Sequence, residues 1–234
     1  MSLFENQRSM LRTVAEALGD TLLEQVAFVG GCTTGLLLTD DFTRGQVRST
    51  DDVDIIVSVM SYIALSNFKD EMKKRGFTES SLEDGPMPIC AMKLGDLRVD
   101  LMPDDSSVLG FSNKWYQLAL ETAEYRALDD TISIRVVSPP LFAATKLEAY
   151  KGRGNNNPLE SHDLEDILNL VDGRIELVDE IQAVQPDDLR DYIACEFKAL
   201  HAHDDFGYAV QSQACGDADR AEVIYERWEA IIRV

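Results

Sequence analysis

The fold is decided by two stretches, Val26-Ala27-Phe28-Val29-Gly30-Gly31 and Asp52-Val53-Asp54-Ile55-Ile56-Val57. Each contains a short apolar run of the length that is typical of a buried strand. The first run stops at a Gly-Gly pair, which permits a sharp turn and close backbone approach. The second begins with two carboxylates two residues apart, and alternate residues of a strand project to the same side. The sequence therefore predicts two strands, one ending in a tight turn and one beginning with paired acids.

The remaining sequence predicts an α+β protein, with a mixed α/β domain over residues 1–138 and an all-helical domain over residues 139–234. In the first domain, apolar periodicity and turn residues predict helices at 3–23, 32–38, 61–76 and 113–127, strands at 26–29, 52–57, 88–94, 97–102 and 131–137, a hairpin turn at Gly95-Asp96 and loops at 40–50 and 152–158. In the second domain, the same signals predict helices at 140–151, 161–172, 176–184, 187–202 and 217–232.

Composition indicates a globular protein. Of 234 residues, 45% are hydrophobic and 27% are charged, which fits disordered, collagen-like and coiled-coil classes poorly. The sequence has no apolar run near the ~20 residues of a membrane helix and no signal region at its start. The cysteines show no C-x-x-C pairing, so we expect reduced thiols, with Cys195 and Cys215 buried. These features predict a cytoplasmic protein that does not enter membranes.

Charge is distributed unevenly along the chain. The net charge is -20, but residues 1–154 hold 23 acidic and 16 basic residues, whereas residues 155–234 hold 19 acidic and 6 basic residues. Affinity for nucleic acid comes mainly from Lys and Arg that replace counterions, so non-specific DNA binding is disfavoured. A nucleotide held by metal ions and one local basic pocket remains compatible with this charge.

Three aspartates are candidate metal ligands. Asp52 and Asp54 project from the same side of one predicted strand, and Asp100 lies on an alternating strand over residues 97–102. Adjacent carboxylates repel unless a cation lies between them, and hard oxygen ligands suit Mg²⁺. Alternatively, Asp52 and Asp54 are two chance acids at a solvated strand edge.

These residues carry a resemblance to a known superfamily. Val29-Gly30-Gly31, Asp52-Val53-Asp54 and Asp100 resemble the pattern of the nucleotidyltransferases that include DNA polymerase beta. Farther along, residues 146–153 and 162–166 resemble the AbiEii-type toxins of abortive-infection and toxin–antitoxin systems, and the similarity covers residues 26–172. The sequence departs from the superfamily pattern in two ways. The interval from Gly31 to Asp52 is longer than usual, and Cys32 stands where a small polar residue is common.

The resemblance implies an enzyme that uses Mg²⁺ or Mn²⁺ to move a nucleoside monophosphate from an NTP to an acceptor. The acceptor would be tRNA or a protein hydroxyl, a cognate antitoxin would be a partner, and the helical domain would complete the nucleotide site. The implied metal ligands are Asp52, Asp54 and Asp100, and the implied catalytic residues are these three with Lys146 and Asp163. The implied nucleotide-binding residues are Gly30, Gly31, Thr33, Arg48, Lys146 and Asp166.

Several of these residues have structural alternatives. Lys146 lies on a mostly apolar helix, from which a lysine can extend its charge to solvent. Asp163 and Asp166 lie in a first helical turn, where acids are favoured by the helix dipole. Arg48 is either a phosphate ligand or a counter-charge for neighbouring acids.

Two other functions remain open. One is an antibiotic adenylyltransferase, for which the acidic C-terminal part would suit a cationic aminoglycoside. The other is a non-catalytic nucleotide-binding protein with a decayed site. If the acceptor is RNA, it needs a confined basic patch, for which the candidates are Arg44, Arg48, Lys93, Arg98, Lys151 and Arg153.

Overall fold

A computed structural model describes residues 2–59, 61–79, 89–110, 112–154 and 157–234. The protein is α+β, with a seven-stranded mixed sheet and many helices. The chain divides into two compact units, of which the first is Met1–Thr33 with Ser49–Ser138 and the second is Thr34–Arg48 with Pro139–Val234. In the described residues, none of the helices combines the length and apolar character needed to cross a membrane.

The first unit contains the sheet, whose strand order is β3-β4-β5-β2-β1-β7-β6. The central strand β2 pairs in parallel with β5 and antiparallel with β1, and β1 pairs in parallel with β7. The strands are β1 (Val26–Val29), β2 (Asp52–Val57), β3 (Thr78–Glu79), β4 (Ala91–Leu94), β5 (Leu97–Pro103), β6 (Glu124–Ala127) and β7 (Ser133–Val136).

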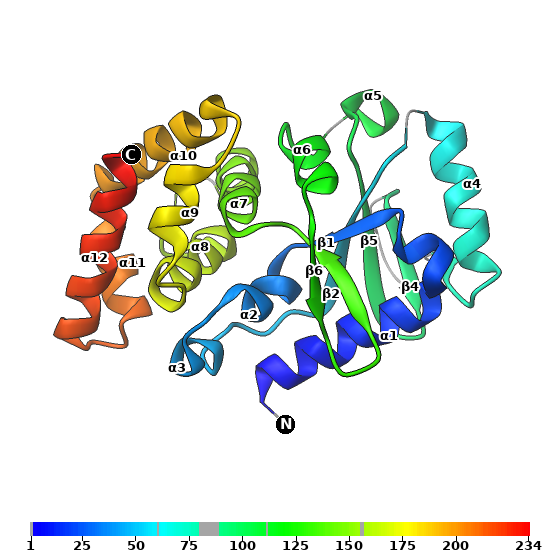
Figure 1. Ribbon diagram of the computed structural model, residues 1–234, viewed down its shortest axis with the longest axis horizontal. Helices are drawn as coiled ribbons and strands as arrows, with labels where there is room; N and C mark the ends of the chain where they lie inside the picture. The colour runs from blue at the N-terminus through cyan, green and yellow to red at the C-terminus, as the bar shows by residue number, and fades with distance from the viewer. Residues whose placement is uncertain (1, 60, 80–88, 111, 155–156) are drawn as a thin grey trace. The chain divides into compact units, whose positions relative to one another are not determined.

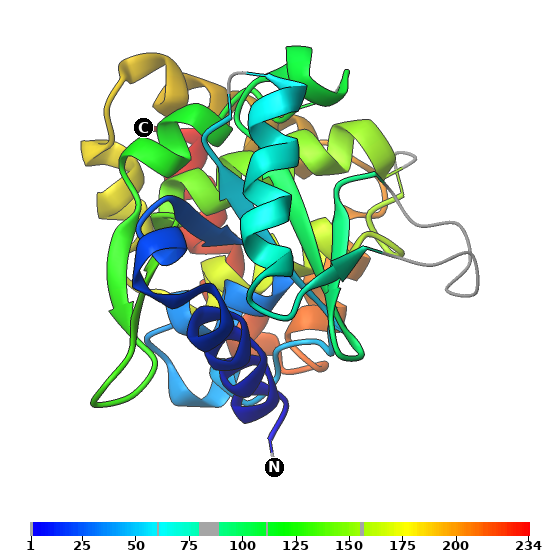
Figure 2. The same ribbon diagram turned by 90° about the vertical axis from the view of Figure 1, so that its right-hand side faces the viewer.

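Helices α1 and α4 pack on one face of this sheet (Figures 1 and 2). Helix α1 buries Leu11, Val14 and Leu18 completely, at positions that share one side of a helix. Helix α4 begins after Ser61, whose hydroxyl caps the helix by accepting a hydrogen bond from the backbone of Ala64. The helices of this unit are α1 (Leu3–Leu23), a 3-10 turn (Gly31–Thr33), α4 (Tyr62–Lys73), α5 (Ser106–Leu109) and α6 (Tyr116–Glu121).

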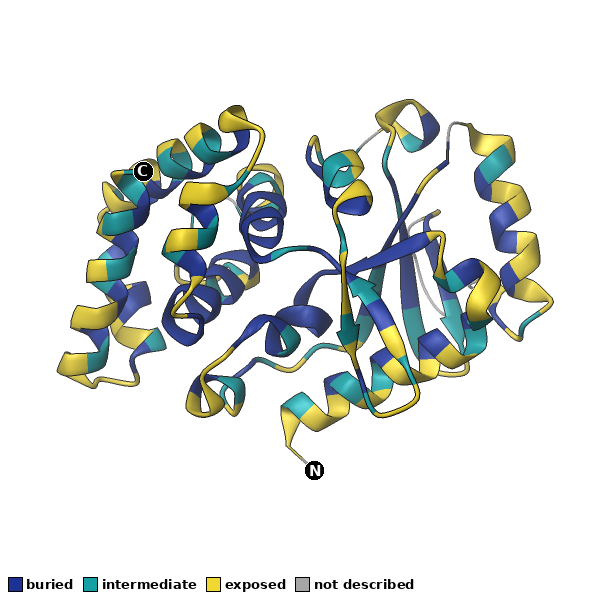
Figure 3. Ribbon diagram, in the orientation of Figure 1, coloured by how far each residue is buried: buried dark blue, intermediate teal, exposed yellow. Residues whose placement is uncertain are grey.

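The second unit is helical and is built around α8. Figure 3 shows that α8 and most of α7 up to Leu147 are buried, whereas α10 and α12 each have one buried and one exposed face. Between these outer helices, the rings of Phe197 and Trp228 stack with centroids 4.1 Å apart. The helices are α2 (Thr34–Leu37), α3 (Asp41–Arg44), α7 (Pro139–Arg153), α8 (His162–Gly173), α9 (Leu177–Ala183), α10 (Asp187–His201), α11 (Phe206–Gln213) and α12 (Ala218–Ile232).

The segment Thr34–Arg48 belongs to the helical unit, although the predicted boundary at residue 138 assigns it to the first domain. The backbone amides of Thr39 and Asp40 both donate to the carbonyl of Gly173, at 2.8 and 2.9 Å. Arg174 donates to the carbonyl of Leu37 at 2.7 Å. These long-range hydrogen bonds fix the segment against the C-terminal end of α8.

Most predicted elements are confirmed. The helix over 3–23 and the strands over 26–29 and 52–57 have their predicted bounds, and β4 and β5 form the predicted hairpin at Gly95-Asp96. The strand expected from 88 begins at Ala91, and residue 88 lies outside the described residues, as do residues 155–156 of the loop expected at 152–158.

Three predictions of local structure are wrong. The helix expected over 113–127 is limited to α6, because residues 124–127 pair with β7 as the edge strand β6. The loop expected over 40–50 contains α3, which Asp40 caps by accepting from the backbone of Thr43 at 2.8 Å. Cys195 and Cys215 are exposed rather than buried. Helices α5 and α11 and strand β3 were not predicted.

Candidate functional site

The three candidate aspartates of the first unit form one cluster. Strands β2 and β5 are parallel neighbours, and their register places Asp54 beside Asp100 and Asp52 beside Arg98. One carboxylate oxygen from each of Asp52, Asp54 and Asp100 lies within 4.8 Å of the other two. Oxygens on one octahedral Mg²⁺ are about 3 to 4 Å apart, so only a small contraction would bring all three onto one ion. Asp100 is 4% exposed, whereas Asp52 and Asp54 are half-buried.

Gly30 makes room for this cluster. Its neighbour Val29 pairs with Asp54 across β1 and β2, and Gly30 itself has a φ of 81°. A Cβ atom on Gly30 would lie 1.9 Å from Oδ2 of Asp54, which no real contact permits. Residue 30 therefore has to be glycine both for its backbone conformation and for the position of the Asp54 carboxylate.

Gly31 and Thr33 form hydrogen bonds at the turn that follows β1. The carbonyl of Gly31 accepts from the side-chain amide of Gln7 at 3.4 Å. Thr33, a predicted nucleotide ligand, is fully buried, and its hydroxyl donates to the carbonyl of Gly30 at 2.8 Å. The structure thus places Gly30, Gly31 and Thr33 in one tight turn next to the acids.

Two neighbouring side chains contact the acid cluster. The hydroxyl of Thr50 donates to Oδ1 of Asp52 at 2.6 Å. Arg98 contacts both oxygens of Asp100, with Nε 2.7 Å from Oδ1 and Nη2 2.5 Å from Oδ2. The hydrogen bond to Asp100 and the charges of the three aspartates raise the pKa of Arg98 above its usual value. The sequence analysis names Arg98 only as a candidate for an RNA-binding patch and misses this contact, although spacing by two on a strand places both side chains on one side.

The cluster fits a divalent cation. Its donors are three carboxylates, which are the hard oxygen ligands that Mg²⁺ and Mn²⁺ prefer. A cationic group, the guanidinium of Arg98, already contacts one of them, and Gly30 leaves the space that the Asp54 carboxylate requires. Asp52, Asp54 and Asp100 are therefore the residues that would hold a metal ion.

The second unit holds the other predicted site residues in a cluster around Lys146. The ammonium group of Lys146, on α7, lies 2.6 Å from Asp166 and 3.2 Å from Asp163 on α8. Lys146 is 5% exposed, so it does not extend to solvent. Burial by itself lowers the pKa of Lys146, but the charges of Asp166 and Asp163 outweigh it and the pKa is raised. Lys146 is therefore a buried cation held between two carboxylates.

Two arginines complete this cluster. Arg153 donates from Nε and Nη2 to Asp163, each at 2.9 Å, and Arg48 lies 3.1 Å from Asp166. The hydroxyl of Thr34 also donates to Asp166, at 3.1 Å. Burial raises the pKa of Asp163, but the hydrogen bond from Arg153 and the charge of Lys146 lower it below its usual value overall. Lys146, Arg48 and Arg153 against two aspartates give the cluster a formal charge of +1.

The acids in the first turn of α8, Asp163 and Asp166, are stabilised by contacts with basic side chains in addition to the helix dipole. Ser161 caps this helix by accepting a hydrogen bond from the backbone of Leu164. Arg48 acts as a counter-charge of Asp166, one of its two predicted roles. Asp163 and Asp166 are 3% and 1% exposed, so both carboxylates lie in the interior of the unit.

Two more of the candidates for an RNA-binding patch also contact acids. Lys151 lies 2.6 Å from Glu196, and Arg44 forms an ion pair with Asp41. Arg48, Arg98 and Arg153 are paired as described above. These five basic side chains are thus partly neutralised within their own units.

No protein-family model matches the sequence, and no curated protein has significant similarity to it.

Proposed function

We propose that this protein is a Mg²⁺-dependent nucleotidyltransferase, which transfers a nucleoside monophosphate from an NTP to a hydroxyl acceptor. The observation that carries the proposal is the cluster of Asp52, Asp54 and Asp100, whose oxygens lie within 4.8 Å of one another on two parallel neighbouring strands. In the reaction, the acceptor oxygen bonds to the α-phosphorus, the hydroxyl loses its proton, and the bond from the α-phosphorus to the β-phosphate oxygen breaks to release pyrophosphate.

In this proposal, each residue of the cluster has a defined task. The three carboxylates hold Mg²⁺ or Mn²⁺, and when bound the metal supplies Lewis acidity that activates the acceptor hydroxyl and offsets the triphosphate charge. Gly30 keeps the Asp54 carboxylate in position, and the hydroxyl of Thr50 orients Asp52. The strands on either side of β5 fix the buried Asp100. These carboxylates are held by sheet backbone, which suits a preorganised metal site.

The Lys146 cluster is proposed to bind phosphate groups. Its formal charge of +1 supports this role, and Arg153, whose side chain is 71% exposed, presents a guanidinium at the surface. The buried Lys146 and the partly buried Arg48 would act by maintaining the positive field around Asp163 and Asp166. The nucleotide-binding roles of these residues remain predictions from the resemblance.

A protein hydroxyl is the acceptor that we favour over RNA. Residues 155–234 carry 19 acidic and 6 basic residues, and the candidate RNA-binding side chains Arg44, Arg48, Arg98, Lys151 and Arg153 each contact an acid. Both features weaken attraction to a phosphate backbone. The proposals of a toxin–antitoxin role, a cognate antitoxin and a cytoplasmic location rest on the sequence alone.

Transfer of radiolabel tests the proposal. The protein is incubated with each α-³²P-labelled NTP, Mg²⁺ and cell extract, and the labelled product is treated with protease or ribonuclease to identify the acceptor. Asp54→Asn is expected to reduce transfer by at least about 10²-fold, since it removes a metal ligand. Asp96→Asn, in the exposed turn between β4 and β5, is the matched control and should retain wild-type transfer. Absence of transfer from every NTP, or undiminished transfer by Asp54→Asn, would refute the proposal.

A further inference from the structure

We propose that Arg98 regulates metal loading of the acid cluster, because its guanidinium and a divalent ion compete for Asp100. This inference rests on the proposed metal site and adds a residue that the resemblance does not assign. It predicts that a divalent ion replaces the guanidinium of Arg98 as the partner of Asp100. Arg98 then determines the metal concentration at which this replacement occurs.

The geometry of the pair makes the competition direct. Arg98 and Asp100 are separated by two residues on β5, and Arg98 lies opposite Asp52 in the register with β2. The guanidinium contacts both oxygens of Asp100, so that neither oxygen is without a cationic donor. A divalent ion on either oxygen would lie within a few Å of the guanidinium and would be repelled by it. Coordination of a divalent ion by Asp100 is therefore favoured when Arg98 leaves.

Burial determines which partner moves. The side chain of Asp100 is 5% exposed and belongs to a strand with neighbours on both sides, whereas the side chain of Arg98 is 36% exposed. A long, partly solvated arginine can turn toward water without rearranging the backbone. Asp100 cannot follow it. The exchange is thus a side-chain movement of Arg98 around a fixed carboxylate.

The charges give the exchange a direction. Three aspartates with Arg98 have a formal charge of -2, and the same aspartates without it have a formal charge of -3. When Arg98 moves away, the aspartates consequently attract a divalent ion more strongly, and the guanidinium of Arg98 becomes able to pair with an anion. A nucleoside triphosphate is such an anion. Binding of the metal should therefore raise the affinity of the protein for the nucleotide, and binding of the nucleotide should raise its affinity for the metal.

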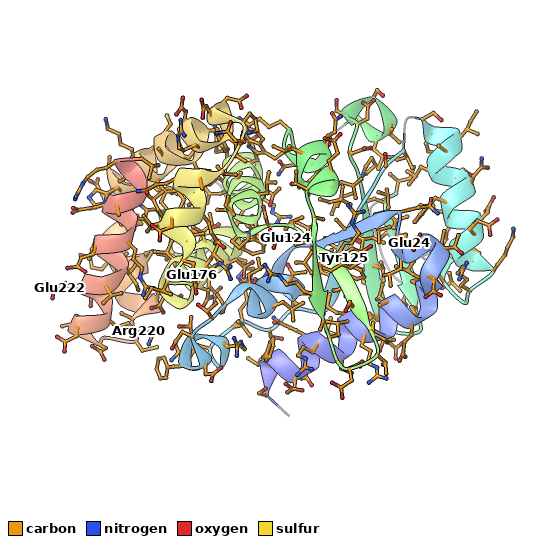
Figure 4. The ribbon with its side chains drawn as sticks, in the orientation of Figure 1. Glu24, Glu124, Tyr125, Glu176, Arg220 and Glu222 are labelled. Carbon is orange, nitrogen blue, oxygen red and sulfur yellow. The ribbon has the colours of Figure 1, made fainter. Side chains whose placement is uncertain are left out.

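Binding of Mn²⁺, measured by electron paramagnetic resonance without nucleotide, tests the inference. Arg98→Met removes the competing charge and is expected to bind Mn²⁺ about tenfold or more tightly than the wild type. Arg126→Met is the matched control, because Arg126 also pairs with an acid two residues away on a strand, at 2.7 Å from Glu124. Its strand, β6, lies four positions from β5 in the sheet, and Glu124 is labelled there in Figure 4. This control should leave Mn²⁺ affinity unchanged.

A second measurement uses the wild-type chain and does not depend on the folding of a variant. The Nε–H resonance of Arg98, which reports its hydrogen bond to Asp100, should shift when Mg²⁺ saturates the protein. Unchanged Mn²⁺ affinity in a folded Arg98→Met variant, or an Arg98 resonance that does not respond to Mg²⁺, would overturn the inference while leaving the metal site intact. If instead the wild-type chain shows no Mn²⁺ binding that is lost in Asp54→Asn, the acid cluster is not a metal site, and both proposals are wrong.

Discussion

Replacement of Gly30 by alanine should damage the acid cluster more than the fold. The added Cβ atom would lie 1.9 Å from Oδ2 of Asp54, and real contacts of this kind begin near 3.0 Å. The carboxylate must therefore withdraw by at least 1.1 Å, the difference between these two distances. A displacement of about 1 Å in a functional group costs roughly 10²-fold in function. We expect Gly30→Ala to weaken Mn²⁺ binding and nucleotidyl transfer by about that factor.

Gly110→Ala separates this effect from backbone strain. Gly110 has a φ of 78°, against 81° for Gly30, but a Cβ atom there would meet nothing within 4 Å. Alanine at either φ costs about 1–2 kcal/mol, which lowers the melting temperature by roughly 2–8 °C in a protein of this size. Gly110→Ala should show this loss of stability with normal Mn²⁺ affinity. If Gly30→Ala also binds Mn²⁺ normally, the role assigned to Gly30 is incorrect.

Further predictions concern the second unit and the thiols. Asp166→Ala should lower the unfolding free energy in urea by about 3 kcal/mol, because it removes the nearer of the two carboxylates that contact the buried Lys146. Lys151→Ala, whose ion pair is equally short but exposed, should cost about 1 kcal/mol or less; equal losses would contradict this. Because the folded-state pKa of Asp163 is depressed, its carboxylate contributes stability above about pH 4 that is lost as the pH falls through that lower pKa. The stability difference between wild type and Asp163→Asn should therefore shrink on acidification, and a constant difference would argue against it. A thiol-reactive dye should label Cys195 and Cys215 in the native protein and the two buried cysteines only after unfolding; rapid labelling of all four would show that the buried pair is accessible.

The acid cluster was predictable because its members lie in strong strand signals. Asp52 and Asp54 begin an apolar strand, and Asp100 lies within an alternating one, so the side that each acid occupies follows from spacing alone. The pairing of β2 with β5 did not follow from spacing, because the register between distant strands depends on tertiary packing. The contact of Gly30 with Asp54 has the same origin, since it depends on the register between β1 and β2.

Edge strand β6 shows where sequence signals are too weak. Glu124 and Tyr125, labelled in Figure 4, are both exposed, and the strand buries no residue that would reveal a period of two. Its conformation is stabilised by hydrogen bonds to β7, which a local pattern does not contain. The sequence consequently predicts a continuous helix over 113–127, whereas the helix ends with α6 and the chain continues into β6.

Arg98 illustrates a different difficulty. An arginine is a common ligand of phosphate groups, and the spacing of Arg98 from Asp100 suits an ion pair on one side of a strand. The sequence contains both signals and does not rank them. In the structure, Arg98 donates two hydrogen bonds to a carboxylate that is almost completely buried. This charge-assisted pair is therefore the interaction that Arg98 makes before any ligand binds.

The path of the chain through its two units has a consequence for synthesis on the ribosome. The chain leaves the first unit after Thr33 and returns at Ser49, so the segment between them belongs to a unit whose other residues follow Ser138. Thr43 precedes its partner Arg220 by 177 residues. At about 5–20 residues per second, translation leaves the segment without that partner for roughly 10–35 s. During this interval the sheet can close once β7 has emerged, while the segment stays exposed to proteases and chaperones.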